Sequence, residues 1–337
     1  MDEWIQLLPS AIRRAVMGMP QQQAADLEEL RIRAERPLEA VAGGKPLFLA
    51  ADGRTVADPR SGLLVSRSDC LRMTEALTRH SVYTHEEQLR RGYVTMPGGH
   101  RVGVAGRAVV EKGAIRLMRD LGGFNVRIAR ERPGVAAGSL GKLLRPERPW
   151  LHHTLIVSPP QTGKTTFLRD LARLISYGWW PKRAVGNAVH PPYGLKVGIV
   201  DERSEIAACR DGVPTFDVGP RTDVLDACPK AEGMMMLIRS MSPDVLIADE
   251  IGRPEDAAAV EEAAHAGVAV IASAHGANLM DAARRPALRR LLEQGVFERF
   301  VLLSRSAGAP LQAAVLDRHG SRALPAATID SGAGGTP

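Results

Sequence analysis

The stretch TLIVSPPQTGKTTFLRDLARLIS occupies residues 154–176 and decides the fold of the second half of the chain. It begins with an apolar run, and its later part places Phe167, Leu171 and Leu174 on one side of a helix. A strand, a short loop and a helix in this order are the setting of a phosphate-binding loop. The tripeptide Gly163–Thr165 alone would occur by chance in roughly one chain in six of this length. The strand and the helix around it therefore carry the prediction.

The loop between this strand and this helix predicts a nucleotide site. Its backbone N–H groups can point at phosphate oxygens, Lys164 can bridge the β- and γ-phosphates, and Thr165 can bind Mg²⁺. Ser158 stands where the standard motif has glycine, but at a strand end small size matters more than a positive φ. The alternative is an unrelated strand-to-helix turn. The predicted nucleotide contacts are Ser158, Pro159, Pro160, Gln161, Thr162, Gly163, Lys164, Thr165 and Thr166.

The rest of this half alternates apolar strands with helices. The strands are TLIVS, KVGIVDE, DVLIADE, VAVIASAHG, RFVLLSR and LQAAVLD, with helices between the first five. Continuous apolar strands separated by helices predict a mostly parallel sheet covered on both faces. The predicted fold class is α/β, with a P-loop domain at residues 151–319.

A smaller α+β domain is predicted for residues 1–132. Apolar residues at helical spacing over 4–16 predict one amphipathic helix. Residues 29–50 alternate as short strands do, with a turn at Gly43 and Gly44.

Further elements follow in the same half. A helix is expected from Ser66, an N-cap candidate, to Leu77, and HEEQLRRG at 85–92 predicts another helical turn. Residues 93–131 alternate apolar and polar side chains between glycines, which predicts an antiparallel meander. Residues 133–150 have the composition of a linker with one short helix, and the Gly/Pro-rich tail at 320–337 is expected to be disordered.

Two acids end the apolar strand VLIADE. At the carboxyl edge of a parallel sheet, where ligands bind, Asp249 can join the Mg²⁺ shell and Glu250 can orient or deprotonate a water. The alternative is a solvated helix start before Pro254.

Two further strands end in polar residues. GIVDERSEI supplies Asp201, Glu202 and Arg203, and VIASAHG supplies His275. Each residue alone would more often be structural. Four polar strand ends in one α/β domain are hard to explain by packing, and together they favour a site.

Composition and charge set the remaining expectations. The net charge of +6 allows weak attraction to anionic partners, but the arginines are scattered, which favours a solvated basic surface. The three cysteines have neither metal-ligand spacing nor an even count, which fits reduced cytoplasmic thiols. No segment has the pattern of a signal peptide or a membrane span, so we expect a soluble protein that meets membranes only through partners.

Several segments resemble one known family. VGIVDERSEIAA, GPRTDVLDACPKAEGMMMLIRSMSPDVLIADEIG and VEEAAHAGVAVIASAHG, with LEELRIRAERPLE and LGGFNVRIARE in the first half, resemble the stage III sporulation protein AA family of endospore-forming bacteria. The resemblance covers most of residues 5–318. That family is similar to the hexameric traffic ATPases of type II and type IV secretion and pilus systems, which implies a RecA-like P-loop ATPase domain.

The resemblance places the family's motifs residue by residue. The phosphate loop falls on 158–166, and the family commonly has Gly-Cys where this chain has Gln161-Thr162, a difference that concerns nucleotide affinity. The implied cofactors are ATP and Mg²⁺. The acidic box falls on Asp201 and Glu202, the Walker B pair on Asp249 and Glu250, and the histidine box on His275. The implied catalytic residues are Glu250, Lys164, Glu202 and His275, and the implied metal ligands are Thr165, Asp249 and Asp201.

The resemblance also implies partners. It implies a cytoplasmic ATPase of the mother cell that forms a homo-oligomeric ring, expected to be a hexamer, and drives the membrane proteins of a sporulation channel between mother cell and forespore. In such a ring an arginine from a neighbouring subunit can stabilise the transition state. For each arginine alone, a surface ion pair is the simpler interpretation. The candidates are Arg101, Arg119, Arg127 and Arg221, with Arg107 and Arg130 also considered.

Two other functions stay open at this point. The fold also serves helicases and recombinases, so a nucleic-acid-dependent ATPase is one alternative, although no aromatic residues are interleaved with the basic ones as single-strand binders require. We therefore expect no specific nucleic-acid partner. The altered loop leaves a nucleotide-binding scaffold without hydrolysis as the other alternative.

Overall fold

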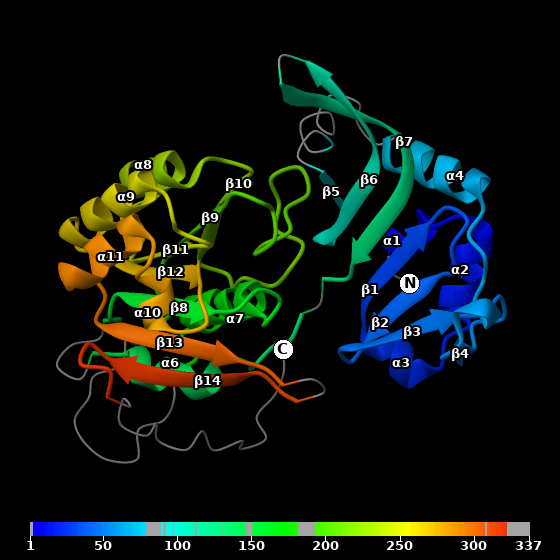
Figure 1. The fold of residues 1–337 in the computed structure, drawn as a ribbon. Helices are drawn as coiled ribbons and strands as arrows, with labels where there is room; N and C mark the ends of the chain where they lie inside the picture. Colours follow the sequence, from blue (N-terminus) through cyan, green and yellow to red (C-terminus); the bar gives the residue numbers. More distant parts are fainter. Residues whose placement is uncertain are drawn as a thin grey trace. The chain divides into compact units, whose positions relative to one another are not determined.

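The computed structural model describes residues 3–78, 89, 92–96, 98–111, 113–129, 131–145, 150–180, 193–306 and 309–321. Most of the helical turn predicted at 85–92, residues 322–337 of the predicted tail, and Arg130 lie outside the described residues. The chain divides into two compact units, Met1–Arg130 and Glu131–Pro337 (Figure 1).

The second unit is built on a 7-stranded sheet in the order β10-β9-β11-β12-β8-β13-β14. All neighbouring strands are parallel except β13 and β14, which are antiparallel. Every residue of β8, β9 and β11 is buried, as expected for central strands covered on both faces. The predicted α/β class with a parallel-rich sheet is confirmed. The strands are β8 Thr154–Ser158, β9 Val197–Asp201, β10 Thr222–Asp226, β11 Val245–Ala248, β12 Ala269–His275, β13 Arg299–Ser304 and β14 Gln312–Asp317.

Helices cover both faces of this sheet (Figure 1). Successive side chains of a strand point to opposite faces. Ile156 of β8 therefore packs in one core with α6 and α7, and Leu155 and Val157 pack in the other with α8, α9 and α11. The helices are α6 Ala137–Leu143, α7 Lys164–Tyr177, α8 Lys230–Met241, α9 Pro254–His265, α10 Leu279–Ala282 and α11 Pro286–Glu293.

Two features of this unit differ from the sequence interpretation. The short helix expected in the linker segment, 133–150, is α6, and its Leu140 and Leu143 are buried in the same core as α7. This helix is therefore part of the second unit's core, which a linker would not be. Strand β10 was not predicted, because its residues are only partly buried and it lies at the sheet edge.

The first unit is an antiparallel sheet with helices packed on one face. The strand order is β4-β3-β2-β1-β7-β6-β5, and the hairpin of β6 and β7 is its longest pairing. The strands are β1 Leu27–Arg33, β2 Glu39–Ala42, β3 Lys45–Leu49, β4 Thr55–Val56, β5 Tyr93–Met96, β6 His100–Glu111 and β7 Ala114–Arg127. The helices are α1 Glu3–Gln6, α2 Ser10–Met17, α3 Gln21–Ala25 and α4 Arg67–Thr78, with a 3₁₀ turn at Pro59–Ser61.

The predicted α+β organisation of this half is therefore present, with local differences. The helix expected over 4–16 is broken into α1 and α2 at Pro9, since proline lacks the N–H that a continuous helix would need there. Ser66 caps α4 as expected, with its Oγ 3.1 Å from the Asp69 N–H nitrogen. Across the described residues of both units, no helix has the length and apolar character needed to cross a membrane.

The position of α6 gives a stability prediction. Leu140→Ala removes a side chain that is 1% exposed, and we expect it to lower the free energy of unfolding of the second unit by about 2–5 kcal/mol through the cavity that it leaves. Urea unfolding followed by tryptophan fluorescence measures this, because Trp150, Trp179 and Trp180 all lie in that unit. Met280→Ala, at an 83% exposed position of the same unit, is the control. A mobile linker would instead give equal, small changes for both variants.

Candidate active site

The phosphate loop lies between the end of β8 and the start of α7. Gly163 precedes the helix with φ 109°, a backbone conformation that only glycine adopts readily. Gln161 has φ 61°, in the left-handed region, although it carries a side chain. Ser158 is a buried strand residue whose Oγ donates to the Pro159 carbonyl oxygen at 2.9 Å. Its strand conformation does not require the glycine of the standard motif.

Lys164 and His275 meet at the start of α7. Lys164 is only 7% exposed, and its Nζ lies 3.1 Å from His275 Nδ1. Burial lowers the pKa of Lys164, while the charges of Asp249 and Glu250 act to raise it. Burial, followed by the charge of Lys164, lowers the pKa of His275. A neutral His275 that accepts a hydrogen bond from the ammonium at Nδ1 carries its proton on Nε2.

Glu250 lies on the other side of His275. His275 Nε2 is 3.5 Å from Glu250 Oε1, and Arg203 Nη1 is 2.9 Å from Glu250 Oε2. The backbone of Glu250 has φ 48°, which is strained for a residue with a side chain. Lys164, His275, Glu250 and Arg203 therefore form one continuous chain of polar contacts at the carboxyl edge of the sheet.

Ser273 contacts both acids that follow strand β11, Asp249 and Glu250. Its hydroxyl donates to Asp249 Oδ1 at 2.5 Å and accepts from the Glu250 N–H at 3.0 Å. Thr165 Oγ1 lies 3.4 Å from the other carboxylate oxygen of Asp249. The sequence interpretation missed Ser273. The available signal in the sequence was a single hydroxyl residue within an apolar strand, β12, and the structure shows that this residue is fully buried.

The two residues of the acidic box have separate environments. The Asp201 carboxylate accepts the backbone N–H groups of Glu205, Ile206 and Ala207, each at 2.9 Å. Both of its carboxylate oxygens thus hold the following loop. The role of metal ligand that the resemblance implied for Asp201 stays a prediction. Glu202, predicted as catalytic, forms an ion pair with the nearly buried Lys230, which lowers the pKa of Glu202 against the effect of burial.

The candidate arginines have local partners or open surroundings. The Arg101 guanidinium lies 3.7 Å from the Tyr93 ring centre, and Arg127 Nε is 3.4 Å from a Glu29 carboxylate oxygen. Arg119 is exposed on β7 opposite Arg107. Arg221, also exposed, lies 5.2 Å from the Tyr193 ring. Their action on a neighbouring subunit stays a prediction.

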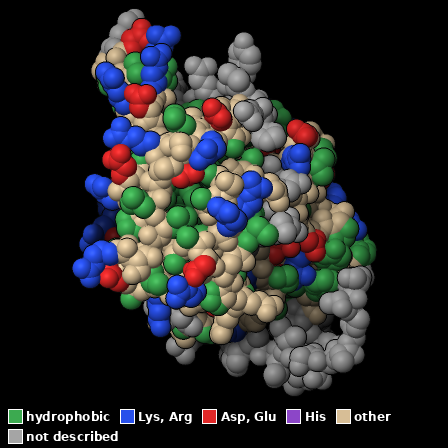
Figure 2. Space-filling model, turned by 90° about the vertical axis from the view of Figure 1, so that its right-hand side faces the viewer, with side chains coloured by type: hydrophobic (Ala, Val, Ile, Leu, Met, Phe, Trp, Pro, Cys, Tyr) green, Lys and Arg blue, Asp and Glu red, His purple; other side chains and the backbone are tan. Residues whose placement is uncertain are grey.

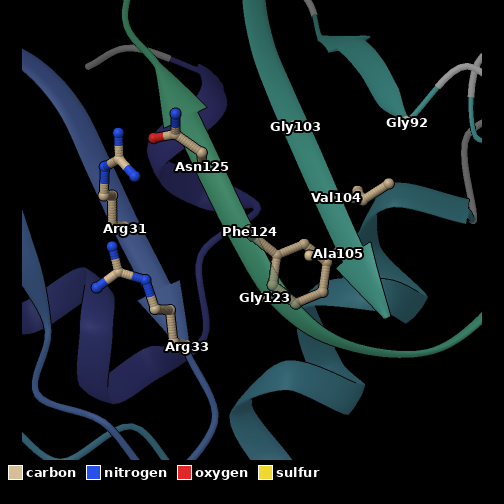
Figure 3. A pocket seen from close by; sticks show the side chains of 9 residues that line it. All are labelled: Arg31, Arg33, Gly92, Gly103, Val104, Ala105, Gly123, Phe124 and Asn125. Carbon is tan, nitrogen blue, oxygen red and sulfur yellow. The ribbon is translucent and has the colours of Figure 1, made fainter. Parts of the chain in front are cut away.

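A pocket of about 330 Å³ lies on the sheet of the first unit, and none of the predicted site residues lines it. Figure 3 shows Arg31 and Arg33 on β1 and Asn125 on β7 around it. Arg31 is paired with Glu29 at 3.0 Å and Arg33 with Glu39 at 2.7 Å. Because each guanidinium has a carboxylate beside it, these ion pairs give the pocket no net positive charge.

One face of the molecule is drawn in Figure 2. On this face, lysine and arginine side chains are interspersed with acidic and hydrophobic ones, in agreement with the scattered charge expected from the sequence.

Comparison with solved structures identifies the class of fold. The chain has the fold of secretion and traffic ATPases. It superposes on the ATPase DotB of Legionella pneumophila with a TM-score of 0.54, over 88% of this chain and 78% of that one at 15% identity. It superposes on the pilus retraction motor PilT, solved with bound ADP, with a TM-score of 0.50, over 86% and 78% at 14% identity. At these identities the likeness concerns the fold alone.

Sequence comparison identifies the family. The family model for sporulation stage III, protein AA matches residues 1–323. The stage III sporulation protein AA of Bacillus subtilis (strain 168) is 48% identical over 321 residues, which cover 95% of this chain and 96% of that protein. The chain belongs to the sporulation stage III protein AA family, as the resemblance of its motifs predicted.

Asp201 gives a prediction about pH. Burial raises its pKa to about 6, with Asp226 and Asp249 adding to the rise, although its backbone hydrogen bonds act to lower it. A carboxyl whose pKa is higher in the folded state contributes stability that is present below pH ~4 and is lost as the pH rises through ~6. We expect a carboxyl NMR titration, without nucleotide or magnesium, to give a midpoint near 6.

The matched variant is Asp201→Asn, which stays neutral at every pH. Between pH ~4 and ~7 the wild type should lose stability relative to this variant in urea unfolding. A midpoint below pH ~4, with a constant stability difference, would mean that the three backbone N–H groups outweigh burial.

Proposed function

We propose that this protein is a Mg²⁺-dependent ATPase of the traffic type, which hydrolyses ATP to ADP and phosphate to drive a sporulation channel between mother cell and forespore. The observation that carries the proposal is the contact chain from Lys164 through His275 to Glu250. It connects the residue expected at the phosphates with the residue expected at the attacking water. Family membership and the fold support the same conclusion.

ATP would bind at the start of α7. The backbone N–H groups of the first helical turn and of the preceding loop provide donors for phosphate oxygens, and the helix dipole favours negative charge there. Lys164 would contribute its ammonium to the β- and γ-phosphates. The solved PilT structure, which has this fold, holds ADP.

The residues present also fit Mg²⁺. Thr165 and Asp249 face each other with a hydroxyl and a carboxylate oxygen, and such hard oxygen ligands are the ones that Mg²⁺ prefers. When bound, Mg²⁺ supplies neutralising charge at the phosphate oxygens. Ser273 orients the Asp249 carboxylate through the other oxygen.

Glu250 would act on the water. The water oxygen attacks the γ-phosphorus, the bond to the β,γ-bridging oxygen breaks, and ADP leaves. Glu250 orients the water and accepts its proton, while Lys164 balances the charge that accumulates on the phosphate oxygens. His275 contacts both residues, so a movement of the Lys164 side chain would shift the Glu250 carboxylate through the His275 ring.

The assembly is part of the proposal. A homo-oligomeric ring, expected to be a hexamer, would act in the mother-cell cytoplasm on the membrane proteins of the channel complex. An arginine of one subunit would reach the nucleotide of the next, and binding and release of nucleotide would move the first unit.

Phosphate release tests the enzyme. Glu250→Gln should keep nucleotide binding and lose phosphate release by about 100-fold or more, because it removes the base but keeps the shape. Lys164→Ala should lose nucleotide binding as well. Glu262→Gln, at an exposed position of α9, is the matched control. Equal background release from the wild type and Glu250→Gln would contradict the ATPase. Stimulation by single-stranded DNA at moderate salt would favour the nucleic-acid-dependent alternative.

The assembly has its own test. Light scattering with ATP and Mg²⁺ should give a mass several times that of one chain, and a strict monomer under all conditions would remove the trans-arginine mechanism. Alanine variants of Arg101, Arg119, Arg127 and Arg221 then follow singly. An inactive one, mixed with inactive Glu250→Gln, should regain part of the activity if the arginine acts across subunits. No recovery on mixing would place that arginine in its own subunit's site.

A further inference from the structure

Hydrogen bonds hold the backbone of the loop on both sides of Arg203. This residue follows the end of β9, where the buried Asp201 carboxylate binds the backbone N–H groups of residues 205–207. Ser204 has φ 55°, and its hydroxyl donates to Asp226 at 2.7 Å. These contacts fold the loop back on itself and fix the direction from which the Arg203 side chain starts.

The carboxylate that Arg203 reaches is also constrained. Glu250 has a left-handed backbone, which is strained and persists only where surrounding contacts determine it. Its N–H is held by Ser273. Its two carboxylate oxygens face different partners, Oε2 toward Arg203 and Oε1 toward His275. The contact with Arg203 is the shorter of the two, at 2.9 Å against 3.5 Å.

We propose that Arg203 is a positioning residue for Glu250, and this inference rests on the proposed ATPase function. Its guanidinium binds Oε2 and thereby turns Oε1 toward His275 and the phosphate loop, where the attacking water must be oriented. Without Arg203, Oε2 loses its cationic partner. The Glu250 side chain, which is 29% exposed, can then rotate toward solvent.

Stability measurements alone cannot distinguish this role from an ordinary surface ion pair. The Arg203 side chain is 44% exposed, and exposed ion pairs contribute little to the free energy of unfolding. The difference between the two roles lies in turnover. A positioning residue changes kcat, whereas a surface ion pair changes neither kcat nor KM.

The test compares Arg203→Ala and Arg203→Lys with the wild type. We expect Arg203→Ala to lower kcat by about 10- to 100-fold with KM for ATP within about threefold, because Arg203 orients the carboxylate that acts on the water and does not bind ATP. Arg203→Lys should recover part of the loss, since it keeps the charge but not the planar fork. Arg284→Ala is the matched control, because Arg284 forms an exposed ion pair with Asp281 at 3.6 Å. Binding of a fluorescent ADP analogue checks that each variant is folded.

A double variant tests whether Arg203 acts through Glu250. Arg203→Ala combined with Glu250→Gln should be no slower than Glu250→Gln alone, because the second change has no carboxylate left to position. Multiplied losses, or a large rise in KM, would mean that Arg203 contacts the nucleotide directly and would overturn the inference.

The outcomes separate the two proposals. An active wild type with an equally active Arg203→Ala would remove the role of Arg203 and leave the ATPase in place. A wild type with no turnover above Glu250→Gln would overturn the ATPase and the positioning role together.

Discussion

The parallel pairing of β8, β12, β11 and β9 is the constraint on which the rest of the site depends. The register places Ser158 of β8 opposite His275 of β12, and aligns Ala248 of β11 with β12 and β9. Residues that follow these strands consequently reach one edge, although more than 100 positions separate Lys164 from His275 in the chain. The hydrogen bonds between the strands thus bring together residues that are distant in the sequence. The side chains then make only short contacts with one another.

Much of this fold could be predicted because its central strands are uninterrupted apolar runs. Buried parallel strands leave that signal in any sequence. Strand β10, TDVLD, does not, since an edge strand that is only partly buried keeps polar residues. The helix around Leu140 was expected, but its burial was not. Its glycines and alanines have the composition of a linker, and only its packing against α7 shows that it belongs to the core.

The site was predictable at the level of strand ends but not of individual contacts. Acids after two strands and a histidine after a third predicted the right edge, where Lys164, Asp249, Glu250 and His275 do meet. The loop contacts of Asp201 were not predictable, because the sequence does not show which backbone N–H groups return to its carboxylate. Its role as a metal ligand stays a prediction. Ser273 could not be found from sequence spacing, because its partners Asp249 and Glu250 follow the neighbouring strand β11.

The conformation of Gln161 bears on how the phosphate loop handles repeated binding. Glycine adopts a φ of 61° without strain, whereas glutamine does so at a cost of about 1 kcal/mol. The side chain has a compensating effect. Glycine has more conformations to lose, so a loop with glutamine gives up less entropy each time it is ordered around a ligand. Under the proposed function, this chain exchanges a permanent enthalpic strain for a smaller entropic cost each time the loop is ordered around a nucleotide.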